Sequence, residues 1–517
     1  MTKLREISLF SGAGGGVLGT HLHGVESVAY VEWAEFPQRI LKARIADGNL
    51  PEGPVHGDVQ EFDGNPWKGK ADIVSAGFPC QPFSLAGNQL ADKDPRNMWP
   101  ATIRILKEVR PKYGFMENVG GLLTQTHGYF KVVTGDLNES GLPLIWDVIP
   151  TAAAGGPHRR DRLWMLTLPD GTDPEDPSIL PSAFVPSEDP MPKPVRMWPT
   201  PVASDGGARQ GSVKWLGSDL VTTVADSEYI DGEISRPQAQ LNPEFTEWMM
   251  GWPIGWTSLD PLDHAQVRDW EAKVRAGTWW SVDPDISKTT KGVANQAMRV
   301  KACGNGQAGP CAALAFESLR RSFGEVAHEA RLQLAGKSVP KVVEISFDDF
   351  LLTDEPYQAL DIRLVAKWDS EARIWRDMTL GLYLAEGNLQ SAPEYKRSWP
   401  RAGLVLDGCI FQRPSILVSR AQQGILGGRR PIDHWDPFDM LPTPVAYDAT
   451  PGGPGNHYTG MGWLAKQGII GEFGSPERVA KAIEVQDRRA VAKKNMKPKV
   501  KAVIQNPDDS PLDFLDP

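Results

Sequence analysis

Cysteine is scarce in this chain. Its 517 residues include four cysteines, which are Cys80, Cys303, Cys311 and Cys409. They are too few and too scattered for a disulfide scaffold or for the paired spacing of a zinc ribbon. We therefore expect free thiols in a reducing compartment. We also expect no metal site, because the sequence offers no cluster of metal ligands.

Long apolar runs are missing as well. We find no run long enough to span a bilayer and no secretory leader, so we expect a cytoplasmic protein without membrane contact. The net charge of −10 argues against a surface that is basic throughout. It argues only weakly against nucleic-acid binding, because a local basic groove is enough to engage phosphates. The length predicts about two or three domains.

Strand-like runs alternate with helical segments through the first third of the chain. Strands are expected at residues 4–10, 28–31, 71–76 and 145–148, with a further strand before Glu117. This alternation predicts an α/β fold with a parallel sheet and helices on both of its faces. The first strand leads into a glycine-rich turn that lacks a Walker lysine-serine pair and the spacing of a dinucleotide fingerprint. The turn is nevertheless of a nucleotide-binding type.

Glu32 and Trp33 end the second expected strand. An acidic side chain at this place can accept both hydroxyls of a ribose, as in other doubly wound nucleoside sites. The alternative for Glu32 is an exposed carboxylate in a turn. Trp33 either stacks on an adenine ring or covers the core, and the sequence does not decide between the two.

Cys80 lies between Pro79 and Gln81, just after the strand at 71–76 and Gly77. Such a cysteine sits on a stiff loop at the carboxyl end of a strand, where α/β sheets carry their chemistry. Taken alone, it is better interpreted as a small buried hydrophobic residue, since free cysteines usually are. Its neighbours in the sequence change that interpretation.

Three segments stand together in one order: the glycine-rich turn, the Pro79-Cys80-Gln81 loop, and Glu117-Asn118-Val119 after a third strand. In this the chain resembles the cytosine-C5 DNA methyltransferases, over roughly residues 4–325. The resemblance implies a Rossmann-like, S-adenosylmethionine-dependent methyltransferase sheet of seven strands. It also implies an inserted target-recognition domain, and a C-terminal appendage lies beyond the resemblance.

The same resemblance implies site residues. Cys80 would add to C6 of a cytosine, Glu117 would act as the acid at N3, and Asn118 would orient Glu117. Arg160 and Arg162 match the arginines of a Gln-x-Arg-x-Arg motif in which His158 replaces the glutamine. Gln81 and Ser84 lie on the loop that would close over an extruded base. S-adenosyl-L-methionine would be held by Phe10, Ser11, Gly12, Ala13, Gly14, Gly15, Glu32, Trp33, Asp58, Gly77, Pro79 and Asn305.

Domain boundaries follow from these motifs. Gly304 and Asn305 match the closing Gly-Asn motif of the family, so the chain is expected to leave the catalytic domain and return to it. We expect a chain ended near residue 340 to fold and to bind cofactor. The expected parts are a catalytic domain (1–168), a target-recognition region (169–291), a returning catalytic segment (292–330), an accessory region (340–475) and a charged, disordered tail (476–517).

We therefore expect a monomeric DNA (cytosine-5-)-methyltransferase of a bacterial or phage-infected cell, with double-stranded DNA as its partner. The sequence leaves open whether a restriction endonuclease accompanies it. One alternative is a methyltransferase fold that has lost turnover and only binds DNA. The other is a methyltransferase that acts on cytosine in tRNA. The intact motifs disfavour the first alternative, and the long recognition region disfavours the second.

Overall fold

A computed structural model describes residues 3–79, 97–124, 129–168, 198–206, 220, 224, 240–336, 362–379 and 389–415. All of these belong to one compact unit, residues 1–429. The predicted tail at 476–517 and most of the expected recognition region before residue 240 lie outside the described residues. In the described part of the chain, no helix is long and apolar enough to cross a membrane.

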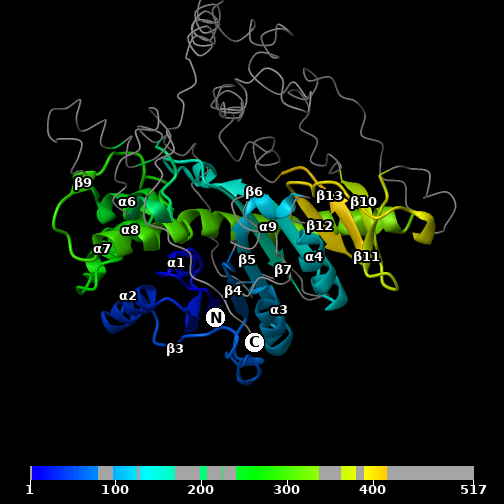
Figure 1. The fold of residues 1–517 in the computed structure, drawn as a ribbon, viewed down its shortest axis with the longest axis horizontal. Helices are drawn as coiled ribbons and strands as arrows, with labels where there is room; N and C mark the ends of the chain where they lie inside the picture. The colour runs from blue at the N-terminus through cyan, green and yellow to red at the C-terminus, as the bar shows by residue number, and fades with distance from the viewer. Residues whose placement is uncertain are drawn as a thin grey trace, which may run out of the picture. The chain divides into compact units, whose positions relative to one another are not determined.

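One large sheet organises the described residues (Figure 1). Its first strands are parallel, in the order β3-β2-β1-β4-β5, and β7 then pairs antiparallel with both β5 and β6. The predicted α/β sheet is confirmed, with β7 as its antiparallel member. The strands are β1 (Arg5–Leu9), β2 (Glu26–Val31), β3 (Val55–His56), β4 (Ile73–Ala76), β5 (Tyr113–Val119), β6 (Leu144–Pro150) and β7 (Asp161–Thr167).

Helices cover both faces of the sheet, because its strands carry apolar side chains on both faces. Phe115 and Met116 are neighbours on β5 but lie in two different hydrophobic clusters, because successive strand residues point to opposite faces. The cluster around Phe115 takes in the helices α1, α2 and α9, and the cluster around Met116 takes in α3 and α4 (Figure 1). These helices are α1 (Gly15–His21), α2 (Glu35–Ala46), α3 (Trp99–Val109), α4 (Phe130–Glu139) and α9 (Gly309–Leu334).

The sheet continues into the predicted accessory region. Strand β12 pairs antiparallel with β6, with Gly403 opposite Trp146, and β13, β10 and β11 follow in that order. The sheet therefore has eleven strands. Figure 1 shows the four added strands beside β6 and α4. They are β10 (Arg363–Asp369), β11 (Ile374–Asp377), β12 (Gly403–Leu406) and β13 (Cys409–Gln412).

Two polar contacts fasten this extension to β6. Trp146 Nε1 donates to the Pro400 carbonyl at 2.9 Å, and a guanidinium nitrogen of Arg413 donates to the Trp146 carbonyl at 2.8 Å. Arg413 also lies 3.4 Å from the buried carboxylate of Asp147, and burial lowers the pKa of this arginine. Ser415 Oγ lies 3.0 Å from the Asp147 carboxylate. The accessory strands therefore cover an edge that β6 would otherwise expose.

Residues 240–305 pack against the amino-terminal part of the chain. Trp256 Nε1 donates to the Ala13 carbonyl at 2.6 Å. The buried Glu247 accepts from the Gly255 and Thr257 main-chain N–H groups and from Arg299, which holds this segment in shape. The described end of the expected recognition region thus touches the glycine-rich turn. Its elements are β8 (Gln240–Leu241), α6 (Pro243–Met249), α7 (His264–Arg275), β9 (Thr289–Thr290) and α8 (Gln296–Asn305).

Short 3-10 helices connect several of these elements. They are η1 (Asn65–Trp67), η4 (Gly120–Leu123), η5 (Thr151–Ala154), η6 (Ala203–Gly206) and η9 (Leu389–Ser391).

Candidate active site

The glycine-rich turn between β1 and α1 adopts a backbone that few residues tolerate. Phe10, Gly12 and Gly14 have φ angles of 55°, 55° and 89°, in the left-handed region. Ser11 Oγ donates to the Ser8 carbonyl at 2.8 Å and closes the turn. At Gly15, a Cβ atom would lie 2.5 Å from the ring of Trp252. The turn therefore depends on its glycines both for conformation and for the approach of the tryptophan.

Glu32 supports this turn from the carboxyl end of β2. One carboxylate oxygen accepts from the Gly12 N–H at 2.7 Å, and the other accepts from the Ala34 N–H at 2.7 Å. Burial raises the pKa of Glu32, and the two N–H donors oppose that effect. Trp33 beside it is 76% exposed, which rules out the core-covering role. Asp58 follows β3, the strand beside β2. Glu32 N donates to the His56 carbonyl at 2.9 Å, which brings the ends of these two strands together.

Glu117 stands near the carboxyl end of β5 and is held by two side chains. Arg162 on β7 places Nε 2.9 Å from Glu117 Oε1. Gln307, between α8 and α9, donates from Nε2 to Glu117 Oε2 at 3.4 Å. The side chain of Glu117 is 15% exposed, so this carboxylate is largely shielded but reachable. Glu117 and Arg162, which come from two different motifs, are thus brought together, and Gln307 is a partner that the sequence did not indicate.

Gly77 and Asn118 connect Glu117 to the segment that leads to Cys80. A Cβ atom at Gly77 would lie 3.6 Å from Glu117 Oε2, so the end of β4 passes directly beside the carboxylate. Asn118 is buried and donates from Nδ2 to the Phe78 carbonyl at 3.3 Å. We expected Asn118 to orient Glu117. Asn118 Oδ1 accepts from the Val119 N–H at 2.8 Å, so these two hydrogen bonds hold the segment after β4 and the main chain beside Asn118.

Arg160 is buried and bonds to main-chain carbonyl groups. Its guanidinium donates to Pro201 at 3.0 Å, to Gly304 at 3.1 Å and to Gly306 at 2.6 Å. Burial, followed by the charge of Arg162, lowers its pKa to about 9. Arg160 therefore ties together three segments of chain. The geometry favours a bracing role for this side chain.

The structure also shows the surroundings of His158 and Asn305. His158 Nε2 donates to the Met249 carbonyl at 3.0 Å, and burial lowers the pKa of this histidine to about 3, so the ring is neutral. Asn305 is exposed at the end of α8. Gly304 before it packs on residues 202–203 so closely that a Cβ atom would overlap their main chain. In this arrangement Asn305 points to solvent, and Gly304 is the residue of the pair that packs.

Part of the chain is similar to proteins of a known family. Residues 4–213 match the family model described as C-5 cytosine-specific DNA methylase. The chain is 34% identical over 169 residues to the type II methyltransferase M.NgoBI of Neisseria gonorrhoeae, which is 32% of this chain and 51% of that protein. It is 35% identical over 172 residues to M.HaeII of Haemophilus aegyptius, which is 33% of this chain and 52% of that protein.

These alignments leave much of each protein unmatched. The matched region spans about half the length of the curated relatives, at 51% and 52%. Among solved structures, the methyltransferase EhMeth of Entamoeba histolytica covers 62% of this chain and 99% of its own, with 12% identity and a TM-score of 0.40.

Three of the four cysteines, Cys303, Cys311 and Cys409, are buried. Burial raises the pKa of the Cys303 thiol far above its ordinary value, that of Cys311 to about 12 and that of Cys409 to about 11. Cys80, Gln81 and Ser84 lie outside the described residues. Burial thus disfavours the other three cysteines as nucleophiles. In the described ranges, no group of three or more metal-ligating side chains occurs.

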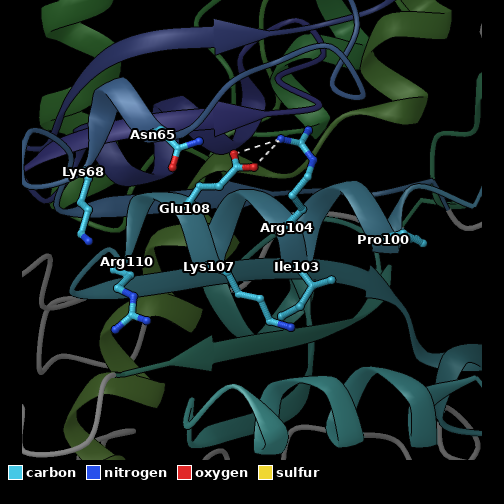
Figure 2. Close-up of a pocket in the computed structure, with 8 residues that line it drawn as sticks. All are labelled: Asn65, Lys68, Pro100, Ile103, Arg104, Lys107, Glu108 and Arg110. Atoms are coloured by element: carbon cyan, nitrogen blue, oxygen red, sulfur yellow. Dashed lines mark hydrogen bonds and ion pairs between the residues drawn. The ribbon is translucent and has the colours of Figure 1, made fainter.

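A hollow of about 520 Å³ lies along α3 and is lined by several cationic side chains (Figure 2). Lys68 precedes β4 and Arg110 precedes β5, so this hollow extends toward the amino ends of those strands. Glu117 and Gly77 lie at the carboxyl ends. Arg104 and Glu108 pair within the hollow at 2.9 Å. The hollow is therefore separate from the site around Glu117.

Proposed function

We propose that this chain transfers a methyl group from S-adenosyl-L-methionine to C5 of cytosine in a specific sequence of double-stranded DNA. The observation that carries the proposal is the setting of Glu117. This carboxylate is paired with Arg162 and lies beside Gly77, three residues before Cys80. In this proposal Glu117 supplies the acid and Cys80 supplies the thiol that methylation of cytosine needs.

The residues around the glycine-rich turn fit the methyl donor. Glu32 has two carboxylate oxygens that hold main-chain N–H groups and retain lone pairs for ribose hydroxyls. The exposed ring of Trp33 offers a face for adenine. Both follow β2, the neighbour of β1, and the strand order reverses between β1 and β4, where open α/β sheets bind ligands. When bound there, the donor supplies an electrophilic methyl group on sulfur.

The chemistry assigns a distinct task to each catalytic side chain. Cytosine C5 is a weak nucleophile, and a thiolate from Cys80 that adds at C6 makes C5 electron-rich like an enamine. The S–C6 bond forms as electron density moves toward N3, where Glu117 in its protonated form delivers a proton. C5 then takes the methyl group. Loss of the C5 proton afterwards expels the thiolate and restores the ring.

The remaining residues hold these groups in place. Arg162 fixes one oxygen of Glu117, and Asn118 fixes the main chain two residues before Cys80. The target atom is inaccessible in a stacked duplex, so the base must be extruded into the pocket. We propose that Gln81 and Ser84 lie on the loop that closes over it. The donor would contact Asp58, Gly77, Pro79 and Asn305 in addition to the turn.

A transfer assay with a tritium-labelled methyl donor tests this function. We expect label to enter unmethylated duplex DNA, and digestion of the product to yield labelled 5-methylcytosine. Label in bulk tRNA at an equal or greater rate would instead support the tRNA alternative. Retention of DNA without any label transfer would support a DNA-binding protein that has lost turnover. Either result contradicts the proposed function.

A further inference from the structure

Gln307 occupies a fixed place that the motifs did not single out. It follows α8, and its own carbonyl accepts from Trp252 Nε1 at 2.8 Å. The carbonyl of the preceding residue, Gly306, accepts from Arg160 at 2.6 Å. The main chain on both sides of the Gln307 side chain is therefore held by buried residues. A side chain that starts from such a fixed backbone is presented in one direction.

That direction is the crevice between the glycine-rich turn and the end of β4. A Cβ atom at Gly16 would overlap Gln307 Oε1, and one at Gly77 would lie 2.9 Å from Gln307 Nε2. The carboxamide thus fills the space that two glycines leave open. It ends on Glu117, with Nε2 3.4 Å from Oε2.

We propose that Gln307 is a positioning residue, which fixes the carboxyl group of Glu117 for the proposed methyl transfer. The proposal rests on the function assigned above. Arg162 holds Oε1 and Gln307 holds Oε2, so rotation of the carboxyl group is opposed at both oxygens. The final torsion of a glutamate is otherwise broad, and an incoming N3 atom would meet many orientations. A fixed carboxyl group presents its proton in one direction.

A carboxamide suits this task because it both donates and accepts. Its NH₂ group can donate to the carboxylate of Glu117, and after a turn its oxygen can accept from the protonated acid while no base is bound. Arginine and lysine can only donate. Both arginines of the motif contribute to the position of Glu117. Arg162 binds Glu117 directly, and Arg160 binds the main chain next to Gln307.

Gln307→Met tests the proposal, because methionine keeps the length of the side chain and removes the donor and the acceptor. With saturating donor and DNA, we expect the single-turnover rate to fall by about 10-fold, the range of one lost hydrogen bond to a charged group. We expect the dissociation constants for donor and DNA to stay within about threefold. Gln266→Met, at an exposed position on α7, is the matched control and should leave the rate unchanged.

A double-mutant cycle separates positioning from packing. In a Glu117→Gln background, Gln307→Met should add no further loss, because the acid that it positions is gone. An unchanged rate in Gln307→Met, an equal additional loss in the Glu117→Gln background, or a loss explained entirely by weaker donor binding would each overturn the proposal. The wild-type chain is measured first: no transfer there refutes the proposed function itself, whereas an active wild type with an unaffected Gln307→Met refutes positioning alone.

Discussion

Cys80→Ser is expected to reduce methyl transfer to less than about 1% of the wild-type rate. A thiol near neutral pH is already a few per cent thiolate and is intrinsically nucleophilic, whereas a serine hydroxyl stays protonated and is a much weaker nucleophile. DNA binding should remain within about tenfold of wild type, since extrusion of the base does not require the bond to C6. Steady-state transfer and a DNA retention assay measure the two quantities.

Cys409→Ala serves as the control for this substitution. Cys409 lies on β13, where burial raises the pKa of its thiol to about 11. Its removal should leave the transfer rate per folded molecule unchanged. A Cys80→Ser variant that retains more than about 1% of the activity would show that another group attacks the base.

A chain ended near residue 340 is expected to lose its folded catalytic sheet, contrary to the expectation from the motifs. The truncation removes β10 to β13 and exposes the edge of β6. It also uncovers the aromatic side chains around α4, since Phe130 packs between Trp146 and Trp399 with ring centroids 5.2 and 5.9 Å away. Bare apolar edges of this kind favour aggregation. Solubility and thermal melting of the truncated chain measure the effect.

Gly403→Val tests the same contact between β12 and β6 in the full chain. A Cβ atom at Gly403 would overlap the indole of Trp146 and would lie 2.8 Å from the Phe411 carbonyl. We expect this substitution to destabilise the protein by about 1–3 kcal/mol, as overpacking does. Gly57→Ala is the control, because its nearest neighbour there is a side-chain atom of Gln38 at 3.9 Å. A truncated chain that melts like the full one, together with a stable Gly403→Val, would show that the accessory strands are dispensable.

The sequence predicts those features of the molecule that depend only on residues close together in the chain. Glu32, Trp33 and Glu117 each end a strand whose apolar pattern is visible locally, so their place at the carboxyl edge of the sheet follows. The partners of β12 could not be predicted in this way. Its pairing with β6 joins residues more than 250 positions apart, and nothing in the pattern of either strand specifies the other.

Long-range contacts also explain what the motifs missed in the site. Gln307 meets Glu117 across 190 positions, and Trp256 meets Ala13 across 243. In the sequence, Trp252 and Trp256 are equally consistent with core residues of a separate region. The motif identifies Arg160 and Arg162 but does not specify the partners of Arg160. Its burial among three main-chain carbonyl groups depends on segments that fold back from residues 201, 304 and 306.

Trapping with 5-fluorocytosine tests the central claim most directly. Attack at C6 and methylation at C5 proceed on this base, but release requires loss of the C5 substituent, and fluorine cannot leave as a cation. With duplex DNA that carries 5-fluorocytosine at the target and with S-adenosylmethionine present, we expect a protein–DNA adduct that resists denaturant and maps by peptide mass to Cys80. Glu117→Gln should slow its formation by roughly 10²–10⁴-fold. An adduct on another residue, or turnover of this DNA without any adduct, would contradict covalent catalysis by Cys80.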